Sequence, residues 1–156
     1  MSYLLEKDAL NGKSGKAFMT ENGRNIELFG LKKFDSNAEF DEADMKVVGT
    51  NRTQKKTTGV TMTGTATIYY GTPHFLRILK EYLQTGKFPE VSFQITNDDP
   101  STSVGVQTVA IYGVKFSKIP IAILDAEADF LEEEIEFSFT DVEPLSEFAD
   151  APAQLG

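Results

Sequence analysis

The sequence predicts a mainly β (α+β) fold, an antiparallel β-sandwich or split barrel with one flanking α-helix at about residues 74–85. Residues 60–70, VTMTGTATIYY, alternate apolar or small side chains with Thr and Tyr, and a period of two indicates a strand with one buried and one wet face. Asn22-Gly23 lies between two further runs and is the strongest short hairpin signal. Only residues 74–85 show convincing helical periodicity, so we expect strands with dominant antiparallel pairing around this single helix.

The length and composition indicate one ordinary globular domain. The chain has 156 residues, of which 40% are hydrophobic and 25% charged. We expect an N-terminal arm at 1–15, a single domain at 16–148 and a frayed tail at 149–156. The absence of cysteine excludes disulfides and thiolate metal sites. Glu6, Lys7 and Asp8 lie where a secretion signal needs apolar residues, and no run approaches the roughly 20 apolar residues of a membrane span.

The first half of the chain reads as strands around a polar loop. Residues 16–20 and 24–33 are expected to be two strands joined at Glu21-Asn22-Gly23, and residues 38–48 a third. Residues 49–59, GTNRTQKKTTG, lack apolar side chains and read as either a long hairpin tip or an ordered docking arm. The strand at 60–70 follows directly.

The helix has recognisable end signals. Thr72 suits the N-cap, Pro73 the first helical position and Gly86 the position after the helix. We expect its apolar stripe to pack on the sheet at Gly64 and Ala66, where small side chains permit a close approach. The stripe consists of Phe75, Ile78, Leu79, Tyr82 and Leu83.

Four more strands are expected after the helix, at 91–96, 104–116, 119–124 and 134–142. Pro120 places the third of these at an edge or bulge. The segment from Pro144 onward is acidic and reads as frayed.

The charge is unevenly distributed along the chain. All fifteen Lys and Arg residues lie at or before Lys118, whereas eleven acids and no base follow it, and the formal net charge is −9. A net negative charge repels the phosphate backbone, so we expect the protein not to bind nucleic acid tightly. The acidic segment is either a solvated strand or an interface that meets a basic surface of a neighbouring copy. The candidate acidic interface is Glu132, Glu134 and Glu136.

The polar loop carries much of the chain's densest positive charge, through Arg52, Lys55 and Lys56, with Lys46 just before it. It reads as a solvated loop, a weak nucleic-acid contact or, as we expect, a contact with another copy. The candidate inter-subunit loop is Gly49, Thr50, Asn51, Arg52, Thr53, Gln54, Lys55, Lys56, Thr57, Thr58 and Gly59.

No constellation of catalytic or metal-binding residues is visible, so we expect no enzyme activity, metal or cofactor. The single histidine, His74, lies beside the helix start and suits a capping or surface role. Asp98 and Asp99 stand before Pro100 and near Ser and Thr residues, which is ordinary turn chemistry rather than an EF-hand. The outward side of the strand at 60–70 is uncharged, although the chain is rich in charged residues. No catalytic or metal site accounts for this neutral row, which consists of Thr61, Thr63, Thr65 and Thr67.

The run GTNRTQKKTTGVTMTGTATIYYGTPHFLRILKEYLQTG resembles the tail tube (tail core) proteins of contractile-tailed phages and phage-tail-like particles. The stretches VGVQTVAIYGVKF and FLEEEIEFSFTDVEPL are similar to the same family, and the resemblance covers about residues 15–148. It implies a tail-tube fold and a structural role in a virion tail or tail-like particle assembled in the bacterial host cytoplasm. Family members form hexameric rings that stack head to tail, with sheath, baseplate and tail terminator proteins as partners.

The resemblance also assigns expected surfaces. Residues 49–59 match the extended loop that reaches a neighbouring subunit or ring, and the four-Thr row becomes a candidate lumen face past which DNA moves without specific binding. No membrane partner is implied. The alternatives are a monomeric β-sandwich module that binds carbohydrate or protein, and an enzyme with an unrecognised site. The chain has no Trp, and the only candidate aromatic platform is Tyr69, Tyr70 and Tyr112.

Overall fold

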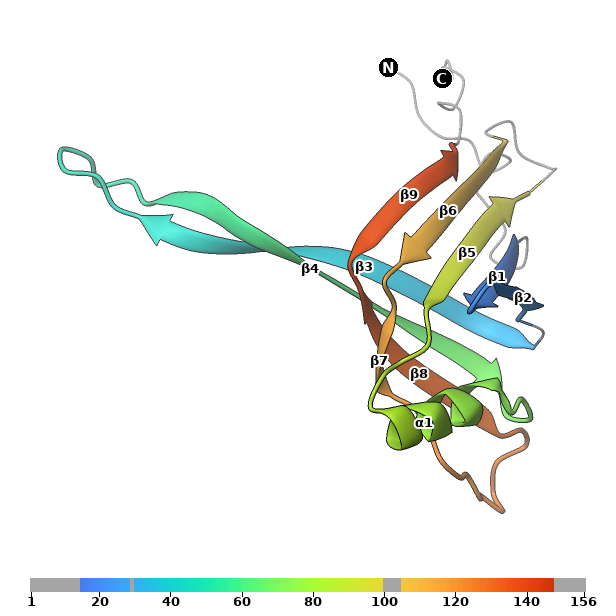
Figure 1. Ribbon diagram of the computed structural model, residues 1–156. Coiled ribbons are helices and arrows are strands. Elements are labelled where there is room, and N and C mark those ends of the chain that lie inside the picture. Colours follow the sequence, from blue (N-terminus) through green and yellow to red (C-terminus); the bar gives the residue numbers. More distant parts are fainter. Residues whose placement is uncertain (1–14, 29, 100–104, 148–156) are drawn as a thin grey trace.

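Two antiparallel sheets and one helix form the domain in a computed structural model (Figure 1). The structure describes residues 15–28, 30–99 and 105–147. Most of the predicted N-terminal arm, and the predicted tail at 149–156, lie outside these ranges. No helix in the described ranges is long and apolar enough to cross a membrane.

The sheets contain five and four strands. The five-stranded sheet has the order β2-β1-β5-β6-β9 and the four-stranded sheet the order β3-β4-β8-β7. The strands are β1 (Gly15–Glu21), β2 (Arg24–Glu27), β3 (Leu31–Met45), β4 (Gln54–Tyr69), β5 (Val91–Asp98), β6 (Val106–Tyr112), β7 (Lys115–Lys118), β8 (Glu132–Phe139) and β9 (Asp141–Ser146).

Aromatic side chains from both sheets form the centre of the core. The Phe93 ring lies 5.0 Å from that of Phe137 and 5.5 Å from that of Phe34, measured between ring centroids. Phe93 and Phe137 are fully buried, as are Met19 and Ile111 of the five-stranded sheet. Burying each such side chain contributes about 1.5–3 kcal/mol, so the facing sheets hold the domain together mainly through this contact.

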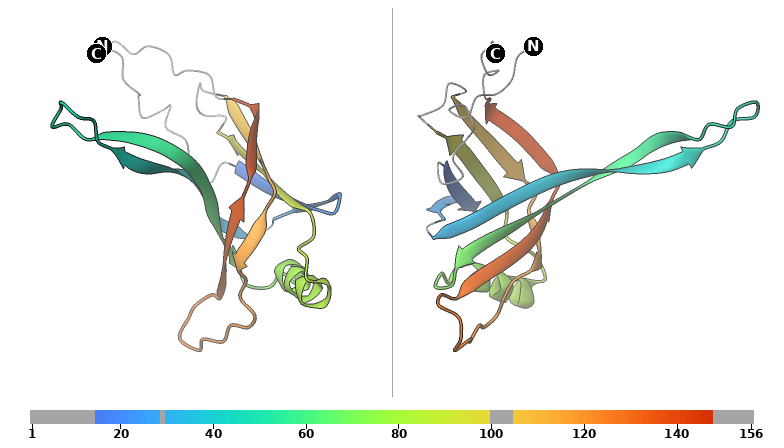
Figure 2. Two further views of the ribbon diagram at one scale, coloured as in Figure 1. Left: turned by 60° about the vertical axis from the view of Figure 1, so that its left-hand side comes forward. Right: turned by 180° about the vertical axis from the view of Figure 1, so that it is seen from behind.

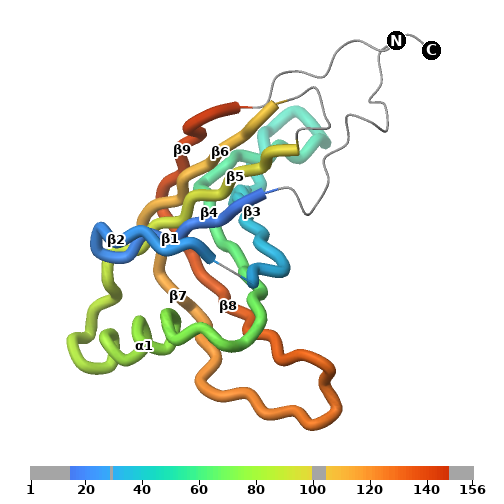
Figure 3. Tube along the Cα trace, turned by 90° about the vertical axis from the view of Figure 1, so that its right-hand side faces the viewer, coloured from blue at the N-terminus to red at the C-terminus, as the bar shows by residue number. Residues whose placement is uncertain are grey.

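Helix α1 (His74–Thr85) crosses one end of the sandwich (Figure 3). Its predicted bounds and its end at Gly86 are confirmed, since Gly86 has φ 74° and its N–H donates to the Tyr82 carbonyl at 2.7 Å. Phe75 is fully buried, with its ring 5.9 Å from that of Phe116 on β7. Pro73, with φ −87° and ψ −4°, occupies the N-cap position and has no side-chain capping bond, whereas the hydroxyl of the predicted cap, Thr72, accepts the His74 N–H at 3.5 Å.

The expected seat of the helix at Gly64 and Ala66 is wrong for Gly64. A Cβ built on Gly64 would lie 2.5 Å from Cζ of Phe137 and 2.7 Å from the carbonyl oxygen of Asp35. Phe137 is the cross-strand partner of Gly64, so the missing side chain makes room for an aromatic ring on the neighbouring strand. Ala66 is buried in the same row.

Two continuous segments change sheets at one corner. The predicted strand at 104–116 divides at Gly113, with φ 71°, into β6 of one sheet and β7 of the other. The chain changes sheets again at Thr140, between β8 and β9, and the Thr140 N–H donates to the Tyr112 carbonyl at 3.1 Å. The β6–β9 ladder therefore continues into the β7–β8 ladder, which closes this corner of the sandwich.

Three other sequence expectations need correction. The predicted strand at 24–33 breaks after Glu27, because Gly30 with φ 74° turns the chain into the other sheet. Residues 119–124 form no strand and lie in a loop. The segment around Pro144, expected to be frayed, belongs to edge strand β9, where a missing backbone N–H is tolerated.

Candidate assembly interfaces

The dominant surface feature is a long hairpin, which projects far beyond the two sheets (Figure 2). Strands β3 and β4 pair from Leu31↔Ile68 to Met45↔Gln54. The predicted loop at 49–59 is therefore only partly a loop: Gly49 to Thr53 lie in the tip, whereas Gln54 to Gly59 belong to β4. These residues remain in a strand without apolar side chains because they pair with β3, and hydrophobic periodicity in the sequence does not reveal such pairing.

A β-bulge interrupts the projecting hairpin beyond Met62, the last residue of β4 that pairs with β8. Asp41 pairs with Gly59 and Glu42 with Thr57, so Thr58 is the extra residue. The Thr58 hydroxyl donates to the Asp41 carbonyl at 3.2 Å and fixes the bulge. Bulges increase the local twist of a ribbon, which re-aims everything beyond them.

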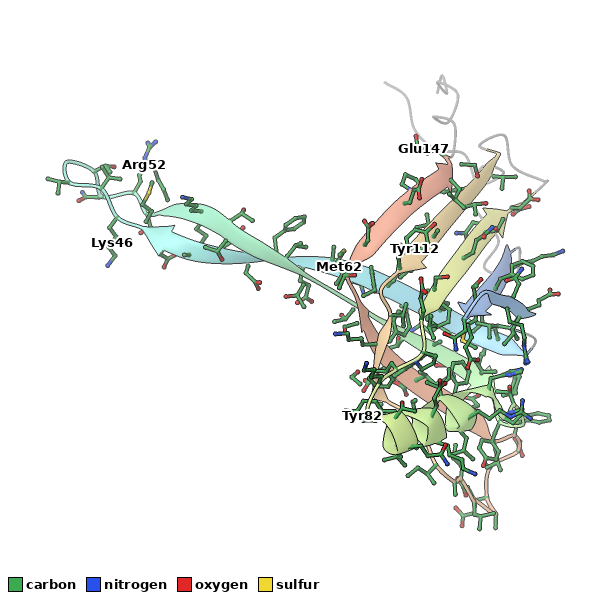
Figure 4. The ribbon with its side chains drawn as sticks, in the orientation of Figure 1. Lys46, Arg52, Met62, Tyr82, Tyr112 and Glu147 are labelled. Atoms are coloured by element: carbon green, nitrogen blue, oxygen red, sulfur yellow. The ribbon has the colours of Figure 1, made fainter. Side chains whose placement is uncertain are left out.

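The inner face of the four-stranded sheet continues onto the projecting hairpin. Ala38 pairs with Met62 and Phe40 with Val60, in the same alternating rows as the buried Ala66 and Ile68. Phe40 is nevertheless 66% exposed, and Val60 is half exposed, because the facing sheet ends before reaching them. Met62 lies at this transition in Figure 4. An apolar stripe at core register without a cover indicates a contact surface.

The outer face of the same sheet brings two predicted sets of residues together. Thr61, Thr63, Thr65 and Thr67 lie on this solvent side of β4, and Thr65 pairs with Glu136, Thr67 with Glu134. Glu132, opposite Tyr69, forms an ion pair with Lys32 at 2.6 Å. The four-Thr row and the acidic row therefore form one surface, which we call the Thr–Glu face.

Glu133 behaves differently from its neighbours. As alternation predicts, it points inward, opposite to Glu132 and Glu134, and it is only 2% exposed. Its Oε2 has no hydrogen-bond partner among the described residues, and burial raises the pKa of its carboxyl above the ordinary value of 4.5. A buried acid of this kind is a cost to the fold rather than part of a reactive pair.

The geometry gives no support to an aromatic binding platform. Tyr69 lies on the four-stranded sheet with its ring 6.1 Å from that of Phe130, whereas Tyr112 belongs to the five-stranded sheet with its hydroxyl 3.5 Å from Glu143. Within the described ranges, no three His, Asp or Glu side chains gather as a metal site.

One exposed segment was missed by sequence reasoning. The loop at 119–131, between β7 and β8, carries almost fully exposed Leu124 and 74% exposed Phe130. The expectation of a strand at 119–124 concealed it, although its closely spaced Asp125, Glu127 and Asp129 were a signal for an exposed loop.

The comparisons with known proteins agree with this architecture. A model of the phage tail tube protein family matches residues 2–146. The chain is 33% identical to phage-like element PBSX protein XkdM of Bacillus subtilis (strain 168) over 147 residues, covering 94% of this chain and 97% of that protein. It is also 34% identical to the uncharacterized protein YqbM of the same bacterium over 152 residues, covering 97% and 96% of the two chains.

Solved structures share the fold at low sequence identity. A chain of the tube-terminating cap of the anti-feeding prophage matches with TM-score 0.67 and 9% identity, over 92% of this chain and 95% of that one. The SPP1 tail tube matches with TM-score 0.62 and 13% identity, over 87% and 78%. With a family model spanning nearly the whole chain, two relatives above 30% identity and the same two-sheet fold, the chain belongs to the phage tail tube protein family.

Proposed function

We propose that this protein is the repeating subunit of a tail tube, in which hexameric rings stack head to tail around a lumen that conducts DNA. The observation that carries the proposal is the projecting hairpin with its uncovered core-register stripe, Ala38, Phe40 and Val60, which continues outward from the partly buried Met62. In a monomer this stripe faces water, whereas a second copy placed under the hairpin would cover it. The stripe and the surface that would cover it are different parts of the same chain. A contact of this kind is heterologous, and it builds rings or stacks.

Free sheet edges supply a second means of association. The outermost strands are β2 and β9 in one sheet and β3 and β7 in the other. An exposed edge offers unpaired N–H and C=O groups to a strand of a neighbouring copy. Strand addition at such edges would make the sheets continuous around a ring.

The Thr–Glu face is our candidate for the lumen wall. Its Thr hydroxyls present no fixed charge, and Glu134 and Glu136 beside them repel phosphate. A wall of this kind would let DNA pass without retaining it. This assignment makes the candidate acidic interface, Glu132, Glu134 and Glu136, part of the lumen rather than a receptor for a neighbour's basic loop.

Tail sheath, baseplate and tail terminator proteins are the proposed partners, and the proposed place of assembly is the bacterial host cytoplasm. The structural neighbours support the sheath and terminator partners, since one comes from a sheath–tube complex and another from a sheath/tube terminator of an extracellular contractile injection system. A structural family does not favour an enzyme, and the separated tyrosines do not favour the monomeric binding module.

Negative-stain electron microscopy of the concentrated protein tests the proposal. We expect rings or tubes with six-fold end views, and sedimentation velocity that shifts to large species as protein concentration rises. A protein that remains monomeric at every concentration and salt condition would contradict it.

A further inference from the structure

The outer end of the hairpin, residues 45–56 and called the hairpin tip from here on, carries both basic side chains and exposed apolar side chains. It contains Lys46, Arg52, Lys55 and Lys56 and no acid. Val48 is fully exposed, and Met45 and Val47 are each nearly half exposed. Among the described residues only Lys55 of the four bases has an ion-pair partner, Glu42 at 4.0 Å. Figure 4 shows Lys46 and Arg52 pointing away from opposite sides of the tip.

The β7–β8 loop, residues 119–131, has the opposite charge and the same apolar exposure. It contains Asp125, Glu127 and Asp129 and no base. Leu124 is 97% exposed and Phe130 74% exposed. The Asp125 carboxylate accepts the Glu127 N–H at 3.0 Å, so a local turn orders the acidic part of the loop.

We propose that the hairpin tip of one copy binds the β7–β8 loop of a second copy. Each surface combines large aliphatic side chains in water with charge of one sign, and the two signs are complementary. The two surfaces lie at separate extremities of the molecule in all views (Figures 1 and 2), so one chain does not join them. The inference rests on the proposed self-assembly and names the receiving surface for the tip.

The Thr–Glu face is a poorer receptor for the tip. Glu132 is already paired with Lys32 at 2.6 Å, and Glu136 pairs in register with Lys118. The cross-strand partners of its Thr row are polar or charged, so that face offers nothing to cover Val48. Of these two surfaces, only the β7–β8 loop combines acids that have no ion pair among the described residues with exposed apolar side chains.

Charge reversal with rescue tests the pairing in the full-length protein. We expect Lys46→Glu with Arg52→Glu, and separately Glu127→Lys with Asp129→Lys, each to raise the concentration needed for assembly at least about tenfold. Combining both pairs restores the attraction and should recover most of the loss. The matched control, Glu81→Lys with Glu90→Lys, changes the net charge as much as the loop pair but lies on neither surface, so assembly should persist.

Cysteine cross-linking tests proximity directly, because the chain has no cysteine of its own. A chain with Val48→Cys and Leu124→Cys, assembled and then oxidised, should give a ladder of covalent multimers on a non-reducing gel. The control chain, with Val48→Cys and the exposed α1 position Leu83→Cys, should give no ladder. A disulfide requires Cα atoms within about 7 Å, so the ladder reports contact.

The outcomes separate this inference from the proposed function. Wild-type tubes combined with no ladder, or a tip variant rescued by Glu134→Lys with Glu136→Lys instead of by the loop pair, overturn the tip–loop contact and leave the tube intact. A wild-type chain that forms no assembly overturns both.

Discussion

At the residue scale, Gly64 lies directly against the ring of Phe137, its cross-strand partner on β8. Its missing side chain leaves the space in which Phe137 packs, and a backbone carbonyl, that of Asp35, closes the other side. We expect Gly64→Ala to lower the free energy of unfolding by about 1–3 kcal/mol, since neither neighbour gives way without strain.

Urea denaturation of dilute, monomeric protein measures this change. Gly59→Ala on the same strand is the control, because an added Cβ there meets only the Asp41 carboxylate at 3.7 Å, an ordinary contact. Equal destabilisation by the two substitutions would show that strand propensity, rather than the ring, dictates glycine at position 64.

Glu133 should make stability depend on pH in the opposite direction from a salt-bridged acid. Burial raises its folded-state pKa, so the folded chain binds more protons than the unfolded chain as pH rises above about 4.5, and stability falls over that range. We expect Glu133→Met to raise the free energy of unfolding at pH 7 by about 1 kcal/mol, because it removes a buried carboxylate with an unpartnered oxygen.

The gain should shrink as pH falls through 4.5, because the wild-type acid then becomes protonated in the unfolded state as well as in the folded state. Thermal unfolding monitored by circular dichroism across this pH range measures it. The exposed neighbour Glu134→Met should change little, and a gain at position 133 that is independent of pH would contradict the buried-acid explanation.

At the element scale, the part of the hairpin beyond Phe40 and Val60 should be needed for assembly but not for folding. No core residue lies between Asp41 and Gly59, and Phe40 and Val60 are cross-strand partners. Replacing residues 41–59 by Asn-Gly therefore closes a short hairpin at an existing pair. We expect the melting temperature of the monomer to change by only a few degrees and ring or tube formation to be lost, as measured by circular dichroism and sedimentation velocity.

A milder change tests the charge on the same element. Lys55→Glu with Lys56→Glu leaves the paired strand in place but introduces repulsion near the tip, so polymers should become shorter or absent while the monomer melts as before. Unchanged polymer lengths in electron micrographs would remove the basic residues from the proposed role of the hairpin.

The sequence predicts elements well where local chemistry decides them. Helix α1 has the predicted bounds because Pro73 and Gly86 mark its ends, and β4 has the predicted alternation. The sheet change at Gly113 was missed because apolar alternation continues through Val114 and Phe116 into the other sheet. Gly64 was predicted to be the seat of the helix because its true partner, Phe137, is 73 positions away in the chain, and periodicity does not show contacts between distant positions.

For the surfaces too, the sequence predicts what local pattern decides and misses what depends on contacts between distant segments. Alternation correctly directs Thr65 and Glu136 outward, yet only the strand order β4-β8 makes them neighbours. The extent of the hairpin was underestimated because pairing, rather than apolar periodicity, keeps Gln54 to Gly59 in a strand. Strand order and pairing depend on contacts between distant segments, so sequence patterns alone do not determine them.

At the scale of the whole molecule, charge should govern behaviour towards DNA. The net charge of −9 and the acids of the Thr–Glu face oppose phosphate contacts. We expect wild-type assemblies to retain no fluorescent duplex DNA on sedimentation at physiological salt. Thr63→Lys with Thr65→Lys should introduce salt-sensitive retention, whereas Glu81→Lys with Glu90→Lys, which lie outside the Thr–Glu face, should not. Retention by the wild type would contradict the proposed conducting lumen.

Strand β4 runs without interruption from the hairpin tip to the core, where it pairs with β8 from Met62 to Tyr69. Under mechanical tension at the tip, that ladder is loaded along the strand direction, so its hydrogen bonds resist together instead of opening one after another. The same pull reaches the corner at Thr140, where β8 leads into the second sheet. A subunit held by its hairpin is thus anchored through both sheets and not through β4 alone.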